Sequence, residues 1–171
     1  MKKLFSLRDL LCEQVRDLYD AEENYSRQVP NFIRSATSPR LKEQFTFIAQ
    51  NTHDNLTLLA GICESFKVPA QGVVCEAMEG LVREAKDHTT DWGDSATIDA
   101  ALISNAQRIV HYEIAGFGTA KEFARSVGEK EASKILHDML QKSFHIDQEL
   151  TRLATGGWFE TGINTEAADA A

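Results

Sequence analysis

Residues 68–94 read VPAQGVVCEAMEGLVREAKDHTTDWGD, and this stretch decides which kind of helical protein the chain can form. Val68-Pro69 ends one long helical pattern, and Trp92-Gly93-Asp94 separates the stretch from the next pattern. The apolar residues between these two ends recur at helical spacing: Val74, Met78, Leu81 and Ala85. The stretch therefore predicts a long connection that contains one short amphipathic helix.

Longer patterns with the period of an amphipathic helix lie on both sides of this connection. They predict helices over about residues 6–35, 39–67, 95–127 and 129–154. Short turns, at Ser35–Pro39 and at Gly128, separate the members of each pair. Two helical hairpins joined by one long connection form an all-α, ferritin-like four-helix bundle with a short crossover helix. An all-α bundle of another topology is the alternative.

Length and composition favour one domain and exclude several classes of protein. A chain of 171 residues can bury a large core, so we expect one bundle over residues 1–155 and a mobile tail over 156–171. The net charge of −8 argues against direct binding of nucleic acid or of an anionic membrane. Three cysteines without CxxC spacing indicate reduced thiols in a cytoplasmic protein.

Three acidic residues fall on the apolar faces of the expected long helices. On a helical wheel these are Glu22 in the first, Glu113 in the third and Asp147 in the fourth. Glu22 and Glu113 each lie 15 residues before their turn, and Asp147 lies 19 residues after the second turn. At about 1.5 Å per residue, all three fall within about one helical turn of the same level. Buried together they would need a metal ion, shared protons or internal water. Asp99 also falls near the apolar arc, but we expect it to be exposed in a first helical turn.

The second helix supplies less than a di-iron centre requires. Such a centre uses Glu from two helices and Glu-x-x-His from two others. Gln50-Asn51-Thr52-His53 has this spacing with Gln in place of Glu, and His53 lies more than about 90° from the apolar centre. The metal-ligand candidates are therefore Glu22, Glu113, Asp147 and His53.

The sequence resembles the YciE/YciF-type ferritin-like stress proteins over most of residues 7–155. Four segments carry the resemblance, in order and at consistent spacing: Asp17–Glu22 (DLYDAE), Ala77–Leu81 (AMEGL), His111–Ala115 (HYEIA) and Leu150–Ala154 (LTRLA). The resemblance implies a bacterial protein that is linked to stress responses, tends to dimerise and has a fold similar to those of rubrerythrin and ferritin.

The chain departs from the family pattern at positions that would hold metal. Ile48, Gln50 and Asn51 stand where the family usually has His and paired Glu, and Lys142-Ser143 replaces a Glu pair. Glu84 matches a family position, for which we expect a buried carboxylate that is hydrogen-bonded to the bundle.

The main hypothesis is a stress-associated protein with a reduced or lost di-metal centre, acting as a homodimeric structural or binding module. It holds no cofactor, or one weakly bound iron or manganese ion. The alternative is an iron- or manganese-binding oxidoreductase or peroxide-scavenging protein of the rubrerythrin type. A subunit of an iron-storage or DNA-protecting cage is a third hypothesis, but storage requires a complete oxidising centre and DNA binding requires more basic charge.

Overall fold

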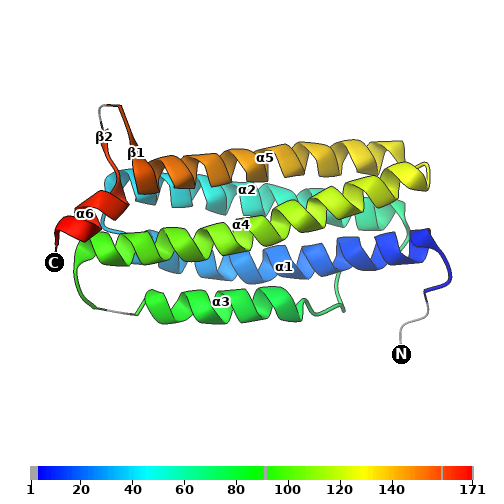
Figure 1. Ribbon diagram of the computed structural model, residues 1–171. Helices are drawn as coiled ribbons and strands as arrows, with labels where there is room; N and C mark the ends of the chain where they lie inside the picture. The colour runs from blue at the N-terminus through cyan, green and yellow to red at the C-terminus, as the bar shows by residue number, and fades with distance from the viewer. Residues whose placement is uncertain (1–3, 91, 159, 171) are drawn as a thin grey trace.

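The computed structural model describes residues 4–90, 92–158 and 160–170. Four long helices form a bundle (Figure 1): α1 (Leu7–Ser35), α2 (Pro39–Ser65), α4 (Ser95–Ser126) and α5 (Lys130–Thr155). Helices α1 and α2 form one hairpin, and α4 and α5 form the other. Helix α3 (Glu76–His88) lies in the connection between them and packs along α1 and α4. The expected all-α bundle of two hairpins with a crossover helix is confirmed.

The ends of the long helices follow local sequence signals. Ser6 and Asp9 form a capping box: Ser6 Oγ accepts from the Asp9 N–H at 3.1 Å, and Asp9 accepts from the Ser6 N–H at 2.9 Å. Ser38 caps α2, with Pro39 at its first position. Gly128 has a φ of 83°, which suits the residue that ends a helix in the left-handed region.

Asp99 is buried, although it was expected to be exposed. Its carboxylate lies at the turn between α1 and α2, where it accepts hydrogen bonds from the backbone N–H groups of Thr37 and Ser38, both at 2.7 Å. The Thr37 hydroxyl donates a third bond at 2.8 Å. Asp99 therefore joins the second hairpin to the start of α2, a contact that no pattern within α4 could reveal.

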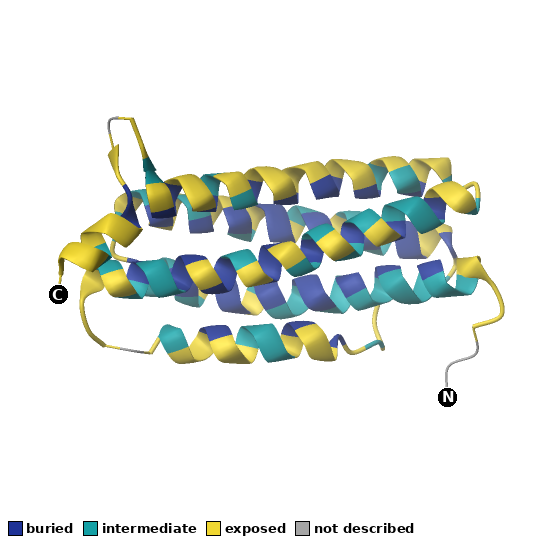
Figure 2. Ribbon diagram, in the orientation of Figure 1, coloured by how far each residue is buried: buried dark blue, intermediate teal, exposed yellow. Residues whose placement is uncertain are grey.

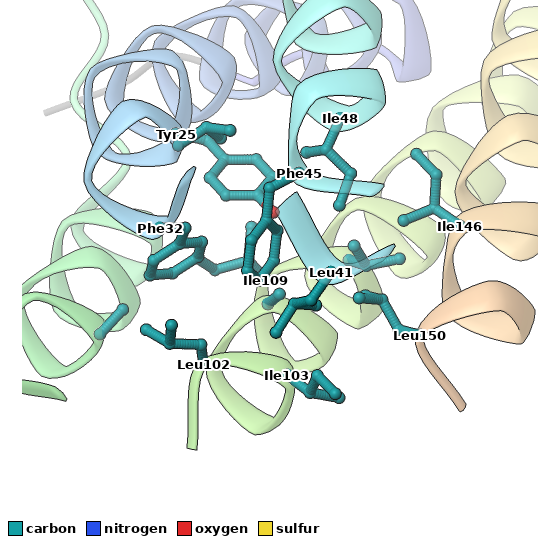
Figure 3. Packing of buried hydrophobic residues seen from close by; sticks show 14 of the residues in the cluster. Tyr25, Phe32, Leu41, Phe45, Ile48, Leu102, Ile103, Ile109, Ile146 and Leu150 are labelled. Atoms are coloured by element: carbon teal, nitrogen blue, oxygen red, sulfur yellow. The ribbon is translucent and has the colours of Figure 1, made fainter. Parts of the chain in front are cut away.

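The apolar core consists of two clusters along the bundle axis. One contains the aromatic side chains of Tyr25, Phe32 and Phe45 (Figure 3), and the other contains Leu18 and Phe117. Along each long helix the buried residues lie on the side of the ribbon that faces the other helices of the bundle (Figure 2). Each long helix contributes to both clusters and changes from one to the other near its middle.

Gly116 allows α1 and α4 to approach closely. A Cβ atom at this position would lie 2.5 Å from Leu18 Cδ2, far inside van der Waals contact. A Cβ at Gly118 would lie 3.9 Å from Leu140 Cδ2, an ordinary contact. The close packing of α1 against α4 therefore requires glycine at position 116 and not at position 118.

The described residues after 155, which are 156–158 and 160–170, fold back on the bundle, whereas the sequence predicted a mobile tail. Strands β1 (Gly156–Gly157) and β2 (Glu160–Thr161) pair as a short hairpin, and α6 (Ile163–Asp169) packs on α4 and α5. Ile163 is buried, and Glu160 pairs with Arg40 of α2 and Arg152 of α5. Trp158 is almost fully exposed at the hairpin.

Among the described helices, none combines the length and the apolar character that a membrane span requires.

Candidate functional site

A layer of polar side chains crosses the middle of the bundle between the two apolar clusters. All four long helices contribute to it, and every member is at least 95% buried. We call this set the polar layer; its members are Glu22 of α1, Asn51, Thr52 and Asn55 of α2, Glu113 of α4 and Ser143 of α5. Polar groups buried at one level of an otherwise apolar core are costly unless they are paired.

Neutral side chains hold the two carboxyl groups of the polar layer. Asn55 Nδ2 donates to Glu22 Oε1 at 2.9 Å, and Ser143 Oγ donates to Glu113 Oε2 at 3.1 Å. Glu22 and Glu113 are 1% and 3% exposed, so solvent does little to stabilise their charge. Burial and repulsion between the two negative charges therefore both oppose ionisation of these carboxyl groups.

Burial raises the pKa of both carboxyl groups. For Glu22, burial is the largest cause and the charge of Glu113 adds to it, while hydrogen bonds from Asn55 and Thr52 lower the pKa by less. For Glu113, burial raises the pKa to about 8, against a smaller lowering by Ser143. At neutral pH the pair retains bound protons instead of carrying two negative charges.

Several buried oxygen atoms around the pair have no hydrogen-bond partner within the described chain. They are Glu22 Oε2, Asn55 Oδ1, Asn51 Oδ1 and Tyr25 Oη. Burial raises the pKa of the Tyr25 hydroxyl, and the negative charges of Glu113 and Glu22 raise it further. These atoms leave the polar layer with unused donor and acceptor capacity, which a proton, an internal water molecule or one small cation could use.

Asp147 does not join the other two acids. Its Oδ1 accepts from Gln107 Nε2 at 3.0 Å and pairs with His111 Nε2 at 3.1 Å, on the α4 and α5 surface. Its side chain is 23% exposed. On α5 the inward position at the level of the acids is Ser143, one helical turn earlier. The expected convergence of three acids is therefore found for two.

His53 and Glu84 also lie outside the polar layer. His53 is exposed on α2, although its neighbour Thr52 is buried. Glu84 was expected to be buried, but its side chain is 56% exposed and binds Arg108 of α4 at 2.7 Å. This ion pair joins the crossover helix to the bundle at its solvent-facing edge.

The donor set of the polar layer does not fit a di-metal centre. Two cations need bridging carboxylates together with imidazole, whereas this layer offers two carboxyl groups and neutral amide and hydroxyl oxygens. Within the described ranges, no group of three or more His, Cys, Asp or Glu side chains is arranged to hold a metal ion. At most, the oxygen atoms suit one hard cation.

A second polar cluster, which the sequence pattern did not reveal, anchors the start of the crossover helix. Tyr112 donates to Asp17 Oδ2 at 2.6 Å, and its hydroxyl lies 2.8 Å from Cys75 Sγ. The Cys75 backbone N–H donates to Asp20 Oδ2 at 2.8 Å. Burial is the main cause that raises the pKa of the Cys75 thiol, which favours the protonated, unreactive form. Asp17 and Asp20 belong to the DLYDAE segment and Tyr112 to HYEIA, so both motifs serve this structural contact.

Comparison with known proteins gives consistent matches over nearly the whole chain. The profile described as a domain of unknown function (DUF892) matches residues 6–168. Protein YciF of Escherichia coli (strain K12) is 31% identical over 150 residues, covering 87% of this chain and 90% of that protein. The crystal structure of the E. coli stress protein YciF has a TM-score of 0.84 at 30% identity and covers 88% of this chain and 95% of that one. YcfI, a putative structural protein from Rhodopseudomonas palustris, has a TM-score of 0.85 at 29% identity, covering 90% and 98%.

Proposed function

The chain belongs to the DUF892 family of YciE/YciF-type proteins, and we propose that it acts as a homodimeric structural or binding module whose di-metal centre is reduced in its ligand set or lost. Its relatives are described as a stress protein and as a putative structural protein. These descriptions support a role in the stress response. We propose the cytoplasm as its compartment, because all three cysteines are free thiols.

The observation that carries this proposal is the chemistry of the polar layer. Two buried carboxyl groups are held by an amide and a hydroxyl, where a di-metal protein would require further carboxylates and imidazole. Carboxyl groups that retain protons at neutral pH carry no negative charge for a metal ion to neutralise. The bundle can then serve as a rigid scaffold whose outer surface carries the binding function.

A second candidate, an iron- or manganese-binding oxidoreductase, is favoured by one specific observation. Glu22 Oε2 and Asn55 Oδ1 are buried and have no hydrogen-bond partner among the described residues, and both are oxygen ligands of the type that a hard cation prefers. A single ion at this level would be held by Glu22 and Glu113, with Asn55 and Ser143 as neutral neighbours. His53 and Asp147 would not contribute, since they lie on the surface.

The metal content of the purified protein separates the two candidates. The full chain is purified from cells grown with added iron and manganese, and the metals are counted by elemental analysis. We expect a stoichiometry near zero, which would reject the oxidoreductase. One metal per chain that is lost in the Glu22→Gln variant would support the second candidate. Two metals per chain would contradict the proposal that the di-metal centre is reduced in its ligand set or lost.

A further inference from the structure

Two of the three cysteines, Cys12 of α1 and Cys63 of α2, belong to the same part of the first hairpin. Cys63 is buried in the apolar cluster that contains Phe117, and Cys12 is partly buried and packs against that cluster. Cys75 lies in the other apolar cluster, where its sulfur contacts the Tyr112 hydroxyl. The fold therefore brings two thiols into one cluster and leaves the third apart from them.

A neighbouring contact between α1 and α2 sets the register of the two cysteines. The guanidinium carbon of Arg8 lies 5.2 Å from the centroid of the Phe66 ring. Cys12 comes four residues after Arg8, and Cys63 comes three residues before Phe66. Helices α1 and α2 run antiparallel (Figure 1), and residues three or four apart share one side of a helix. Both steps therefore lead to the next level on the facing sides, where Cys12 lies opposite Cys63.

A groove beside α1 gives an oxidant access to Cys12. The groove has a volume of about 420 Å³ and lies between the start of α1 and the loop from α2 to α3; Cys12, Arg16 and Val68 are among its lining residues. Arg16 follows Cys12 by one helical turn and donates to the Gln71 carbonyl oxygen at 2.6 Å. Arg16 Nε is buried and has no hydrogen-bond partner within the described chain. A cation is therefore held next to the partly exposed thiol, whereas Cys63 is only 1% exposed.

Burial raises the pKa of both thiols, and the neighbouring arginines oppose this effect. Burial is the main cause that raises the pKa of Cys63 to about 11; the charge of Arg16 lowers it, and that of Cys12 raises it further. For Cys12, burial is again the largest cause of a raised pKa, Arg8 and Arg16 lower it, and two nearby acidic side chains add to it. Exposure to the groove and the two arginines make Cys12 the thiol that reacts first.

We propose that Cys12 and Cys63 form a redox-sensitive pair, which a hydroperoxide converts into a reversible disulfide between α1 and α2. The Cys12 thiolate attacks one oxygen of hydrogen peroxide, so an S–O bond forms, the O–O bond breaks, and hydroxide leaves and takes up the thiol proton to become water. The Cys63 sulfur then attacks the sulfenic acid at Cys12. An S–S bond forms, the S–O bond breaks, and the hydroxide takes the Cys63 proton and leaves as a second water. The two thiols are oxidised, and one peroxide is reduced to two water molecules.

The disulfide closes a loop from residue 12 to residue 63, which contains the turn between α1 and α2. It holds together the two helices that contribute Glu22 and Asn55 to the polar layer. A cross-link over a long loop restricts the unfolded chain, so the oxidised protein should melt at least about 5 °C above the reduced one. Disulfides of cytoplasmic proteins are usually transient and serve redox sensing, which agrees with the compartment proposed above.

The test uses the full-length chain, because trypsin separates its three cysteines. Cleavage after Lys and Arg places Cys12 in residues 9–16, Cys63 in residues 43–67 and Cys75 in residues 68–83. The reduced protein is treated with hydrogen peroxide, unfolded in iodoacetamide and digested, and the peptides are identified by mass spectrometry. We expect peptide 9–16 to be joined to peptide 43–67, the link to disappear with dithiothreitol, and peptide 68–83 to be alkylated.

Single variants separate the roles of the two thiols. Cys63→Ser should prevent the cross-link and leave a sulfenic acid at Cys12 that dimedone labels, whereas Cys12→Ser should prevent both. Cys75→Ser should form the cross-link as wild type does. Arg16→Gln should slow the reaction at least about threefold, because it removes a cation that favours the thiolate. Arg27→Gln, which removes an exposed arginine further along α1, is the matched control and should leave the rate unchanged.

Three results would overturn the proposal. The first is oxidation of Cys12 to sulfenic or higher acids in wild type without a link to Cys63, which would show that the two sulfurs do not meet. The second is a cross-link that includes Cys75 or joins two chains, which a non-reducing gel distinguishes from a link within one chain. The third is a chain that forms no cross-link with peroxide at all. Thermal melting of each variant shows that it is folded, and an oxidised wild type that melts below the reduced one would also contradict a disulfide within the native hairpin.

Discussion

Replacing Glu113 by glutamine should stabilise the protein at neutral pH. The unfolded chain ionises this carboxyl above its ordinary value of 4.5, whereas burial raises the pKa in the folded state to about 8. At about 1.36 kcal/mol per pH unit, retaining this proton at pH 7 costs the folded protein roughly 3 kcal/mol. Glutamine is neutral at every pH and can still accept the hydrogen bond from Ser143. The variant should therefore gain up to about 3 kcal/mol at pH 7, or roughly 6–12 °C in melting temperature.

The sign of the pH dependence follows from the raised pKa. A carboxyl whose pKa is higher in the folded state stabilises folding below its unfolded pKa and loses that contribution as the pH rises through the folded one. The advantage of Glu113→Gln should thus be absent near pH 4 and grow between about pH 4.5 and 8. Thermal melting at a series of pH values measures it, with the exposed Glu131→Gln as a control on α5.

A metal-bound site would give the opposite result. Wild type would then be more stable than Glu113→Gln at pH 7, because an amide is a poor replacement for a carboxylate ligand. A chelator would remove that difference. Such an outcome would refute the reasoning that a protonated acid pair occupies the polar layer.

Three further variants test the packing of the bundle. Glu22→Leu should raise the melting temperature, since an apolar residue removes a desolvation cost of a few kcal/mol; a decrease that chelator treatment of wild type reproduces would indicate a ligand. Asp99→Ala should cost about 3 kcal/mol in denaturant unfolding, because it leaves the Thr37 and Ser38 N–H groups without their acceptor; Asp94→Ala, at an exposed N-cap, should cost about 1 kcal/mol. Gly116→Val should cost about 1–3 kcal/mol through its clash with Leu18, whereas Gly118→Ala should be neutral or stabilising; equal effects would contradict the close approach at Gly116.

The fold could be predicted from the sequence because its signals are local. The capping box at Ser6, the Ser38-Pro39 start and Gly128 act within a few residues, and helical periodicity repeats over many turns. The short turns and the long connection then left few ways to join the helices. The burial of Glu22 and Glu113 was also predicted, because each lies at the centre of a long apolar stripe.

Phase on a helical wheel correctly put His53 away from the core, but it misplaced Asp147 and Asp99. Asp147 is close in phase to inward residues, but Gln107 and His111 on α4 hold it at the surface. Asp99 lies near the start of α4, where its side chain could have been solvated. It is buried because the turn between α1 and α2 packs against it. The helix crossings that bring these partners together depend on contacts between residues far apart in the sequence.

Sequence by itself determined the helices, their order, the crossover and the two acids that enter the core, because each depends on periodicity and local hydrogen bonding. Only the tertiary structure decided that Asn55 and Ser143 donate hydrogen bonds to these acids, that Asp99 binds the turn between α1 and α2, and that the tail folds back through Ile163. It also placed Phe47 of α2 beside His145 of α5. Such pairings are set by the depth and rotation at which separate helices pack, and a shift of one residue turns a side chain by about 100°.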